Sequence, residues 1–257
     1  MFKELWLICL TLLIASCSSI QDTTSNKHKV SIDVMRNSTV ALVDKLEDIG
    51  YLSYCSGVWI DQKTILTAYH CVSRDPQTVE ELFKKITQNI DPEVVGAFVN
   101  FKTWNQIQTT NDNEQPYKTA NTAMIVAVDT ENDLAMLTSV EEDFQHDNAK
   151  VSKTTSVADG AKVHIIGHNR HLPYSYAPGV ISNTRTLKNP DGHTTKLLQI
   201  NSSAWRGYSG GGAFGSNGEL VGITSFLWNP QAVGPLLTMF VHHDSIIAFL
   251  ESEHWLK

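Results

Sequence analysis

The residues best suited to chemistry lie in the run Gly207-Tyr208-Ser209-Gly210-Gly211. A serine hydroxyl is a weak nucleophile until a neighbouring base takes its proton and a third group orients that base. A glycine-rich run of this kind can also be no more than a turn. Ser209 is therefore a candidate nucleophile whose partners must come from elsewhere in the chain.

Two other runs hold residue types that fit the missing roles. His70 follows a strand-like run in Leu66-Thr67-Ala68-Tyr69-His70-Cys71, and Asp133 precedes one in Glu131-Asn132-Asp133-Leu134-Ala135-Met136-Leu137. Histidine can serve as the base and aspartate can orient it. Taken singly, such a histidine is more often structural, and such an aspartate is more often a turn or strand cap.

Together, and in the order His, Asp, Ser, these runs resemble the chymotrypsin/trypsin family of serine peptidases. That family has its base in Thr-Ala-x-His-Cys, its acid in Asn/Asp-Asp-aliphatic-x-Leu and its nucleophile in Gly-x-Ser-Gly-Gly, and other triad proteins use different orders. The resemblance covers about residues 40–250 and is weakest over 78–119. It implies an all-β fold of two six-stranded antiparallel Greek-key β-barrels with a C-terminal helix.

The resemblance also implies an activity and a role for each residue. The chain would be a serine endopeptidase that forms an acyl-enzyme on Ser209, with a protein or peptide as its substrate. His70 would take the serine's proton and deliver it to the leaving amine, and Asp133 would fix the tautomer of His70. The N–H groups of Gly207 and Ser209 would form the oxyanion hole. No cofactor and no metal are implied.

The same resemblance implies which residues form the substrate pocket. Ser203 falls at its base, where an acidic residue would select Lys or Arg, and Leu227 and Leu236 fall where small residues keep the pocket open. Residues 218–225 resemble the strand that lines the substrate channel. We expect a shallow or apolar pocket and cleavage after a small or medium apolar residue, with these pocket residues: Ser203, Ser225, Phe226, Leu227 and Leu236.

The sequence departs from the animal digestive enzymes at Tyr208, which stands where they keep an aspartate that pairs with a newly cut N-terminus. We therefore expect no activation by N-terminal insertion. The bacterial HtrA-type branch also lacks that aspartate, and residues 163–168 and 178–182 resemble that branch. Those proteins often add a PDZ domain, and we expect none here, because few residues follow Leu250.

Three other functional interpretations fit parts of the sequence. An α/β-hydrolase also fits Gly-x-Ser-x-Gly, but its acid and base follow the serine, whereas the residues after Ser209 are typical of strands and one helix. His242, His243 and His254 are then surface or packing residues. A catalytically silent binding protein on the same fold is the second alternative. A metal site in His164-x-x-x-His168-x-x-His171 is the third, and a surface loop is the simpler interpretation of that run.

The N-terminus has the pattern of an exported lipoprotein. Lys3 precedes an apolar run over residues 5–15, which is too short to span a bilayer and typical of a secretory signal. Ile14-Ala15-Ser16-Cys17 resembles the bacterial lipobox, which implies cleavage before Cys17 and a lipid on its thiol. An ordinary signal peptide cut nearby is the alternative. We expect a signal peptide over 1–16, a polar tether over 17–35, and a periplasmic or cell-surface protein anchored in a bacterial membrane.

Composition agrees with an exported globular enzyme. The chain has 257 residues, 42% of them hydrophobic, and a net charge of −7 without a basic stripe, so nucleic acid is not an expected partner. We expect Cys9 in the signal and a lipid on Cys17, which leaves Cys55 and Cys71 as a disulfide or as two buried thiols. The resemblance implies the disulfide, because the family bridges these two positions.

Short apolar runs separated by turn residues predict the strands. Asn217-Gly218 is the strongest hairpin signal, and helices are expected over 78–90 and from Asp244 or Ser245 onward, with a polar loop over 103–118. The protease domain should span 36–257, with barrels over about 36–145 and 150–242 and a helix over 244–255. The expected strands are residues 55–60, 64–68, 94–101, 119–128, 134–137, 162–167, 179–183, 196–201, 212–214, 219–226 and 236–241.

Overall fold

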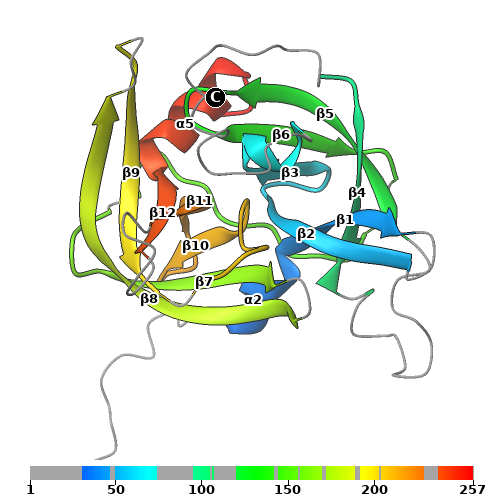
Figure 1. The fold of residues 1–257 in the computed structure, drawn as a ribbon, viewed down its shortest axis with the longest axis horizontal. Helices are drawn as coiled ribbons and strands as arrows, with labels where there is room; N and C mark the ends of the chain where they lie inside the picture. Colours follow the sequence, from blue (N-terminus) through cyan, green and yellow to red (C-terminus); the bar gives the residue numbers. More distant parts are fainter. Residues whose placement is uncertain are drawn as a thin grey trace, which may run out of the picture.

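Two closed β-barrels lie side by side in the computed structural model (Figure 1). The prediction of two six-stranded antiparallel barrels and a C-terminal helix is confirmed. Cys17, the signal peptide and the helix expected over 78–90 lie outside the described residues, as does most of the loop expected over 103–118. The structure describes residues 31–46, 50–73, 95–104, 106, 120–141, 144–155, 157–169, 172–188, 192–202, 204–228 and 237–256.

The first barrel has the strand order β1-β2-β3-β6-β5-β4, and β1 closes it by pairing with β4. The sequence analysis did not predict β1. Its residues Val40 to Val43 are all buried, so the run lacks the alternation of polar and apolar residues that marks a half-buried strand. The strands are β1 (Thr39–Leu46), β2 (Gly50–Trp59), β3 (Thr64–Thr67), β4 (Phe98–Thr103), β5 (Asn121–Asp129) and β6 (Leu134–Ser139).

The second barrel repeats this order, as β7-β8-β9-β12-β11-β10, and β7 closes it by pairing with β10. β8 is much longer than the expected run over 179–183. Its first half pairs only with β7 and its second half with β9, so Pro178 lies where one neighbour is missing and proline is tolerated. The strands are β7 (Lys162–Asn169), β8 (Leu172–Lys188), β9 (Thr194–Asn201), β10 (Gly212–Gly215), β11 (Leu220–Trp228) and β12 (Leu237–His242). The Asn217-Gly218 hairpin joins β10 to β11 as predicted.

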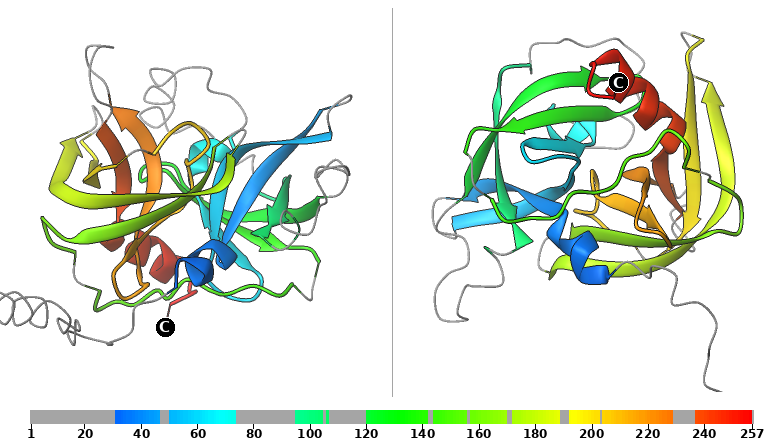
Figure 2. Two further views of the ribbon diagram at one scale, coloured as in Figure 1. Left: turned by 90° about the horizontal axis from the view of Figure 1, so that it is seen from below. Right: turned by 180° about the vertical axis from the view of Figure 1, so that it is seen from behind.

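Each barrel has its own apolar core, and a third cluster joins the two barrels. The third cluster includes Leu66 and Leu134 from the first barrel and Ile223 from the second. Two helices complete it, α2 (Ile32–Asn37) with Met35 and α5 (His243–Ser252) with Leu250. Both helices lie on the same side of the barrels (Figure 2). The barrels therefore share buried surface and do not stand apart.

The helix ends differ from the expectation. α2 begins at Ile32 and is capped by the Ser31 hydroxyl, so the folded domain begins earlier than the boundary at residue 36 that we predicted. The N-cap of α5 is His242, whose imidazole Nδ1 accepts a hydrogen bond from the Asp244 N–H at 3.0 Å, and not Asp244 or Ser245. The predicted inward face of Ile246, Phe249 and Leu250 is confirmed.

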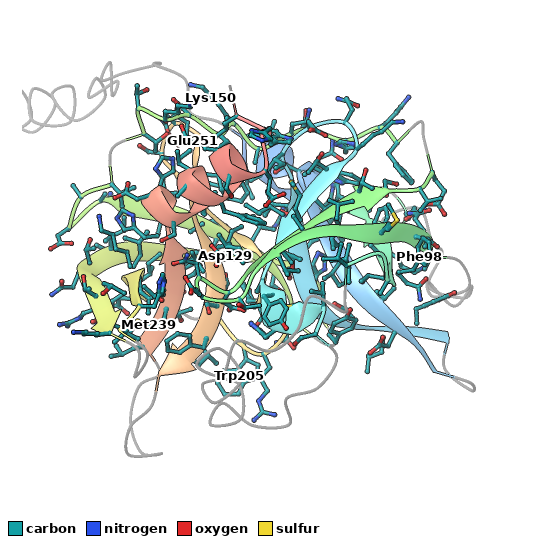
Figure 3. The ribbon with its side chains drawn as sticks, turned by 90° about the horizontal axis from the view of Figure 1, so that it is seen from above. Phe98, Asp129, Lys150, Trp205, Met239 and Glu251 are labelled. Carbon is teal, nitrogen blue, oxygen red and sulfur yellow. A yellow bond between two sulfur atoms is a disulfide. The ribbon has the colours of Figure 1, made fainter. Side chains whose placement is uncertain are left out.

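The segment 144–155 between the barrels is bonded to both of them. The Ala149 N–H donates to the Trp59 carbonyl at 2.7 Å, and the Lys150 carbonyl accepts from the Leu220 N–H at 2.9 Å. Lys153 of this segment forms an ion pair with Glu251 of α5, with 2.7 Å between Nζ and Oε1, and Figure 3 shows Lys150 and Glu251 toward the same edge of the molecule. Among the residues that the structure describes, no helix is both long and apolar enough to cross a membrane.

Candidate active site

His70 is held by the short connection that follows β3. The 3₁₀ helix η1 (Tyr69–Cys71) carries it, and the predicted disulfide between Cys71 and Cys55 of β2 is confirmed, with 6.0 Å between the two Cα atoms. This bond ties η1 to β2 directly beside the imidazole. His70 can therefore move little relative to the first barrel.

Asp133 lies in the turn between β5 and β6. Asp129, at the end of β5 (Figure 3), accepts hydrogen bonds from the backbone N–H groups of Glu131 at 3.1 Å and Asn132 at 2.9 Å. Asp133 itself has a φ of 56°, in the left-handed region that aspartate tolerates better than most residues. This turn directs a 4% exposed carboxylate toward η1.

The Asp133 carboxylate contacts His70 at two places. Its Oδ1 accepts from the His70 backbone N–H at 3.0 Å, and both its oxygens lie 2.9 to 3.0 Å from the imidazole Nδ1. Burial alone would lower the pKa of His70, but the charge of Asp133 and its hydrogen bond outweigh burial and raise that pKa above its ordinary value. The carboxylate thus keeps the proton on Nδ1 and leaves Nε2 as the basic nitrogen.

Ser209 sits in a loop whose backbone is bonded to both barrels. Its carbonyl accepts from the Ser56 N–H at 2.7 Å, and the next N–H, of Gly210, donates to the Thr224 carbonyl at 2.7 Å. Gly210 has a φ of 80°, and a Cβ there would lie 2.1 Å from the Thr67 hydroxyl oxygen. Only glycine fits this position, which explains one glycine of the sequence run.

Ser225 links Ser209 to Asp133. Its hydroxyl donates to Asp133 Oδ2, while its carbonyl accepts from the Ser209 hydroxyl at 3.4 Å. We expected Ser225 to line the substrate pocket, and the sequence carried no signal of its own for the contact with Asp133. Within the described part of the chain, no hydrogen bond joins the Ser209 hydroxyl to His70. Such bonds are often open in ligand-free sites and tighten when substrate binds.

The loop before Ser209 leaves two N–H groups without a partner. Among the described residues, no acceptor faces the N–H of Gly207 or of Ser209. Gly207 has a φ of 100°, and a Cβ there would lie 1.9 Å from the His168 carbonyl oxygen, so this position also requires glycine. Two unpaired N–H groups on either side of one residue can bind a developing negative charge.

Tyr208, between those two N–H groups, points into the second barrel and is 4% exposed. A Cβ on Gly167 of β7 would lie 2.5 Å from the tyrosine ring, so the ring packs directly on that strand. Burial raises the pKa of Tyr208, and a side-chain hydrogen bond with Ser175 opposes that rise. The tyrosine therefore supports the loop from within the barrel.

The structure describes two of the four remaining residues that we predicted for the pocket. Ser203 and Leu236 lie outside the described residues, while Phe226 and Leu227 are half-buried on β11. Trp205, two residues before Gly207, is 53% exposed and projects from the edge of the molecule (Figure 3). The two described residues of this group that we predicted for the pocket, Phe226 and Leu227, are thus apolar and half-buried.

Of the three histidines considered as a metal site, the two that the structure describes lie apart. His164 and His168 both lie on β7, four residues or about 13 Å apart along a strand. His164 contacts the Tyr176 hydroxyl at 3.1 Å, whereas His168 accepts from the Tyr174 N–H, and burial lowers the pKa of His168 to about 3. His171 lies outside the described residues.

Comparisons with known proteins agree with this geometry. The profile of the family described as "Trypsin-like peptidase domain" matches residues 55–223. The MamO protease domain from Magnetospirillum magneticum, in its apo form, has a TM-score of 0.59 and 17% identity, over 84% of this chain and 96% of that chain. An inactive serine-to-alanine mutant of Rv3671c from M. tuberculosis H37Rv has a TM-score of 0.61 and 15% identity, over 86% and 88%.

A serine endoprotease from Yersinia pestis has a TM-score of 0.58 and 18% identity, over 87% of this chain and 66% of that chain. At such identities these structures share the fold, and they carry no information on activity. No curated protein matches the chain.

Proposed function

Because this chain belongs to the trypsin-like peptidase family, we propose that it is a serine endopeptidase with Ser209 as nucleophile, His70 as general base and Asp133 as the group that orients His70. The observation that carries the proposal is the Asp133 carboxylate, which lies 2.9 Å from Nδ1 of His70 and is joined through Ser225 to Ser209. Three separate loops bring these side chains together.

In the first half of the reaction, the Ser209 hydroxyl leaves the Ser225 carbonyl and attacks the carbonyl carbon of the peptide bond. Its proton passes to Nε2 of His70, and the imidazolium that forms is stabilised by Asp133. His70 then protonates the leaving amine, the C–N bond breaks, and an ester on Ser209 remains. Water repeats these steps with His70 as base and releases the acid product.

The tetrahedral intermediates carry a negative oxygen, which the N–H groups of Gly207 and Ser209 would bind. One such donor is typically worth about 3 kcal/mol in the transition state. The unpaired state of both groups supports this role. Tyr208 holds the loop without an N-terminal ion pair, which supports an enzyme that needs no activating cut at its N-terminus.

The substrate is a protein or peptide, and we propose a small or medium apolar residue before the cut bond. Half-buried Phe226 and Leu227 on β11 support this preference, because an apolar wall offers no partner to a Lys or Arg side chain. A cleavage profile from a peptide library dominated by Arg or Lys would contradict it.

A catalytically silent binding protein is the second candidate. The observation in its favour is the Ser209 hydroxyl, which bonds to the Ser225 carbonyl at 3.4 Å instead of to His70. Such a protein would keep the fold and bind peptides without cleaving them.

Labelling with a fluorophosphonate separates the two candidates. The active enzyme should gain one adduct on Ser209 and hydrolyse casein or peptides, whereas Ser209→Ala should do neither. Ser216→Ala, a change at an exposed serine in the following turn, is the matched control and should behave as wild type. A folded wild-type protein without an adduct would establish the silent protein.

We also propose that the protein is exported and anchored by a lipid on Cys17. The Cys55–Cys71 disulfide supports an oxidising, extracytoplasmic compartment. Intact-mass measurement of the mature protein tests the anchor: the expected form begins at Cys17 with a lipid, and an unlipidated form or another start would contradict it.

A further inference from the structure

Ser56 of β2 is fully buried between the two barrels and has no part in the mechanism described so far. Its hydroxyl donates to the Gly207 carbonyl at 2.7 Å and accepts from the His168 N–H of β7 at 2.9 Å. Its backbone N–H donates to the Ser209 carbonyl at 2.7 Å. Ser56 of the first barrel is therefore hydrogen-bonded to the second barrel's loop on both sides of Tyr208.

The carbonyls of residues 207–209 are all hydrogen-bonded. The Gly207 carbonyl accepts from the Ser56 hydroxyl, and the Ser209 carbonyl accepts from the Ser56 N–H. The Tyr208 carbonyl accepts from the Gly211 N–H. The Tyr208 N–H closes a turn onto the Trp205 carbonyl at 3.1 Å. Only the N–H groups of Gly207 and Ser209 stay unpaired among these described residues. The bonds from Ser56 thus fix the backbone that aims those two groups.

The hydroxyl is needed at this place because it joins two buried groups that cannot be left alone. Within the described chain, the Gly207 carbonyl accepts only from this hydroxyl, and the buried His168 N–H donates to it. Without the hydroxyl, the buried Gly207 carbonyl would have no described partner and the His168 N–H would lose this acceptor, which is costly enough to shift the backbone. Movement of Gly207 by even a fraction of an ångström displaces its N–H from the position that the oxyanion occupies.

We propose that Ser56 is a positioning residue, whose hydroxyl holds Gly207 so that the N–H groups of Gly207 and Ser209 converge on the oxyanion. This inference rests on the proposed serine endopeptidase function. It predicts an effect on the transition state and little effect on the binding of the ground-state substrate.

The test is Ser56→Ala, with Ser53→Ala as the matched control. Ser53 is a buried serine on the same strand whose hydroxyl, among the described residues, bonds only to the Cys55 carbonyl, at 3.4 Å. Ser56→Ala should lower kcat by about tenfold to a hundredfold with KM within about twofold, because removing one partner of a buried hydrogen bond costs that much. The rate of fluorophosphonate labelling should fall by a similar factor, and Ser53→Ala should keep both rates.

Each result has a defined meaning. A Ser56→Ala protein that labels at the wild-type rate, or that changes only KM, overturns the role of Ser56 while leaving the proposed function intact. Wild-type protein that takes no label overturns the proposed function, and the role of Ser56 with it. If Ser56→Ala does not fold, a crystal structure of the wild type with a peptide aldehyde on Ser209 decides. Ser56 must then still bond to the Gly207 carbonyl while both N–H groups bind the hemiacetal oxygen, and a detached Ser56 hydroxyl overturns the inference.

Discussion

Asparagine at position 133 would keep the shape of aspartate but replace one carboxylate oxygen with an NH₂ group. At the Oδ1 position that NH₂ would face the His70 backbone N–H, which can only donate. At the Oδ2 position it would face Nδ1 of His70 and the Ser225 hydroxyl, and both of these can accept. We therefore expect the amide nitrogen at Oδ2, with Nδ1 of His70 as its acceptor.

This arrangement places the proton of a neutral His70 on Nε2, which then cannot take the proton of Ser209. The expected loss of kcat for Asp133→Asn is about 10⁴-fold, or about 5.5 kcal/mol, the size typical of this change in a serine-protease triad. The pKa of His70 should also fall, because burial acts alone once the charge of Asp133 is gone. In the wild type, kcat/KM should rise with pH through a pKa above the usual value of about 6.5.

Two measurements check this reasoning. Steady-state hydrolysis gives kcat, and NMR titration of the His70 ring in the uninhibited protein gives its pKa. Ser225→Ala is the matched control, because it removes one hydroxyl from Asp133 and keeps the charge; it should cost at most about a hundredfold in kcat. An Asp133→Asn enzyme within tenfold of the wild-type kcat, or with an unchanged His70 pKa, would refute the tautomer argument.

Three further changes have defined outcomes. Replacing Cys55 and Cys71 together with alanine opens a loop with a sequence separation of 16. The free energy of unfolding from a urea titration should fall by about 3 kcal/mol, and an unchanged value would contradict a stabilising role for the disulfide. Tyr208→Phe should lose about 1 kcal/mol of stability with its bond to Ser175 and keep most activity, and complete inactivation would instead assign the hydroxyl a role in the reaction. Gly210→Ala should abolish fluorophosphonate labelling, because its Cβ would lie 2.1 Å from the Thr67 hydroxyl oxygen and 2.2 Å from the Ser56 carbonyl oxygen; normal labelling would show that the loop adapts.

The sequence predicted the parts of the fold that depend on local pattern. The β10–β11 hairpin follows from Asn217-Gly218, and the inner face of α5 follows from the spacing of Ile246, Phe249 and Leu250. β1 was missed because it is buried on both faces, and most of β8 was missed because its proline, glycine and polar residues are typical of turns. Sequence patterns therefore miss a strand that is buried on both faces and a strand that is rich in turn residues.

The candidate site was predicted through the resemblance, since no local pattern brings His70, Asp133 and Ser209 together. Contacts between the barrels could not be anticipated. Ser225 touches Asp133 across a sequence separation of 92, and Ser56 touches Gly207 across 151. A serine in a strand has no periodicity or motif that reports such a partner. These contacts depend on how the two barrels pack, which only the folded structure describes.

The cluster shared by the barrels has a consequence for when the protein can act. Leu66 lies four residues before His70, Leu134 directly follows Asp133, and both belong to the cluster that α5 completes with Ile246, Phe249 and Leu250. The loops that carry His70 and Asp133 thus gain their full apolar support only after α5 has been synthesised and has docked. A chain in which α5 has not yet docked therefore lacks part of the apolar support of both loops. In the proposed peptidase, substrate cleavage would therefore begin only after α5 has docked on the two barrels.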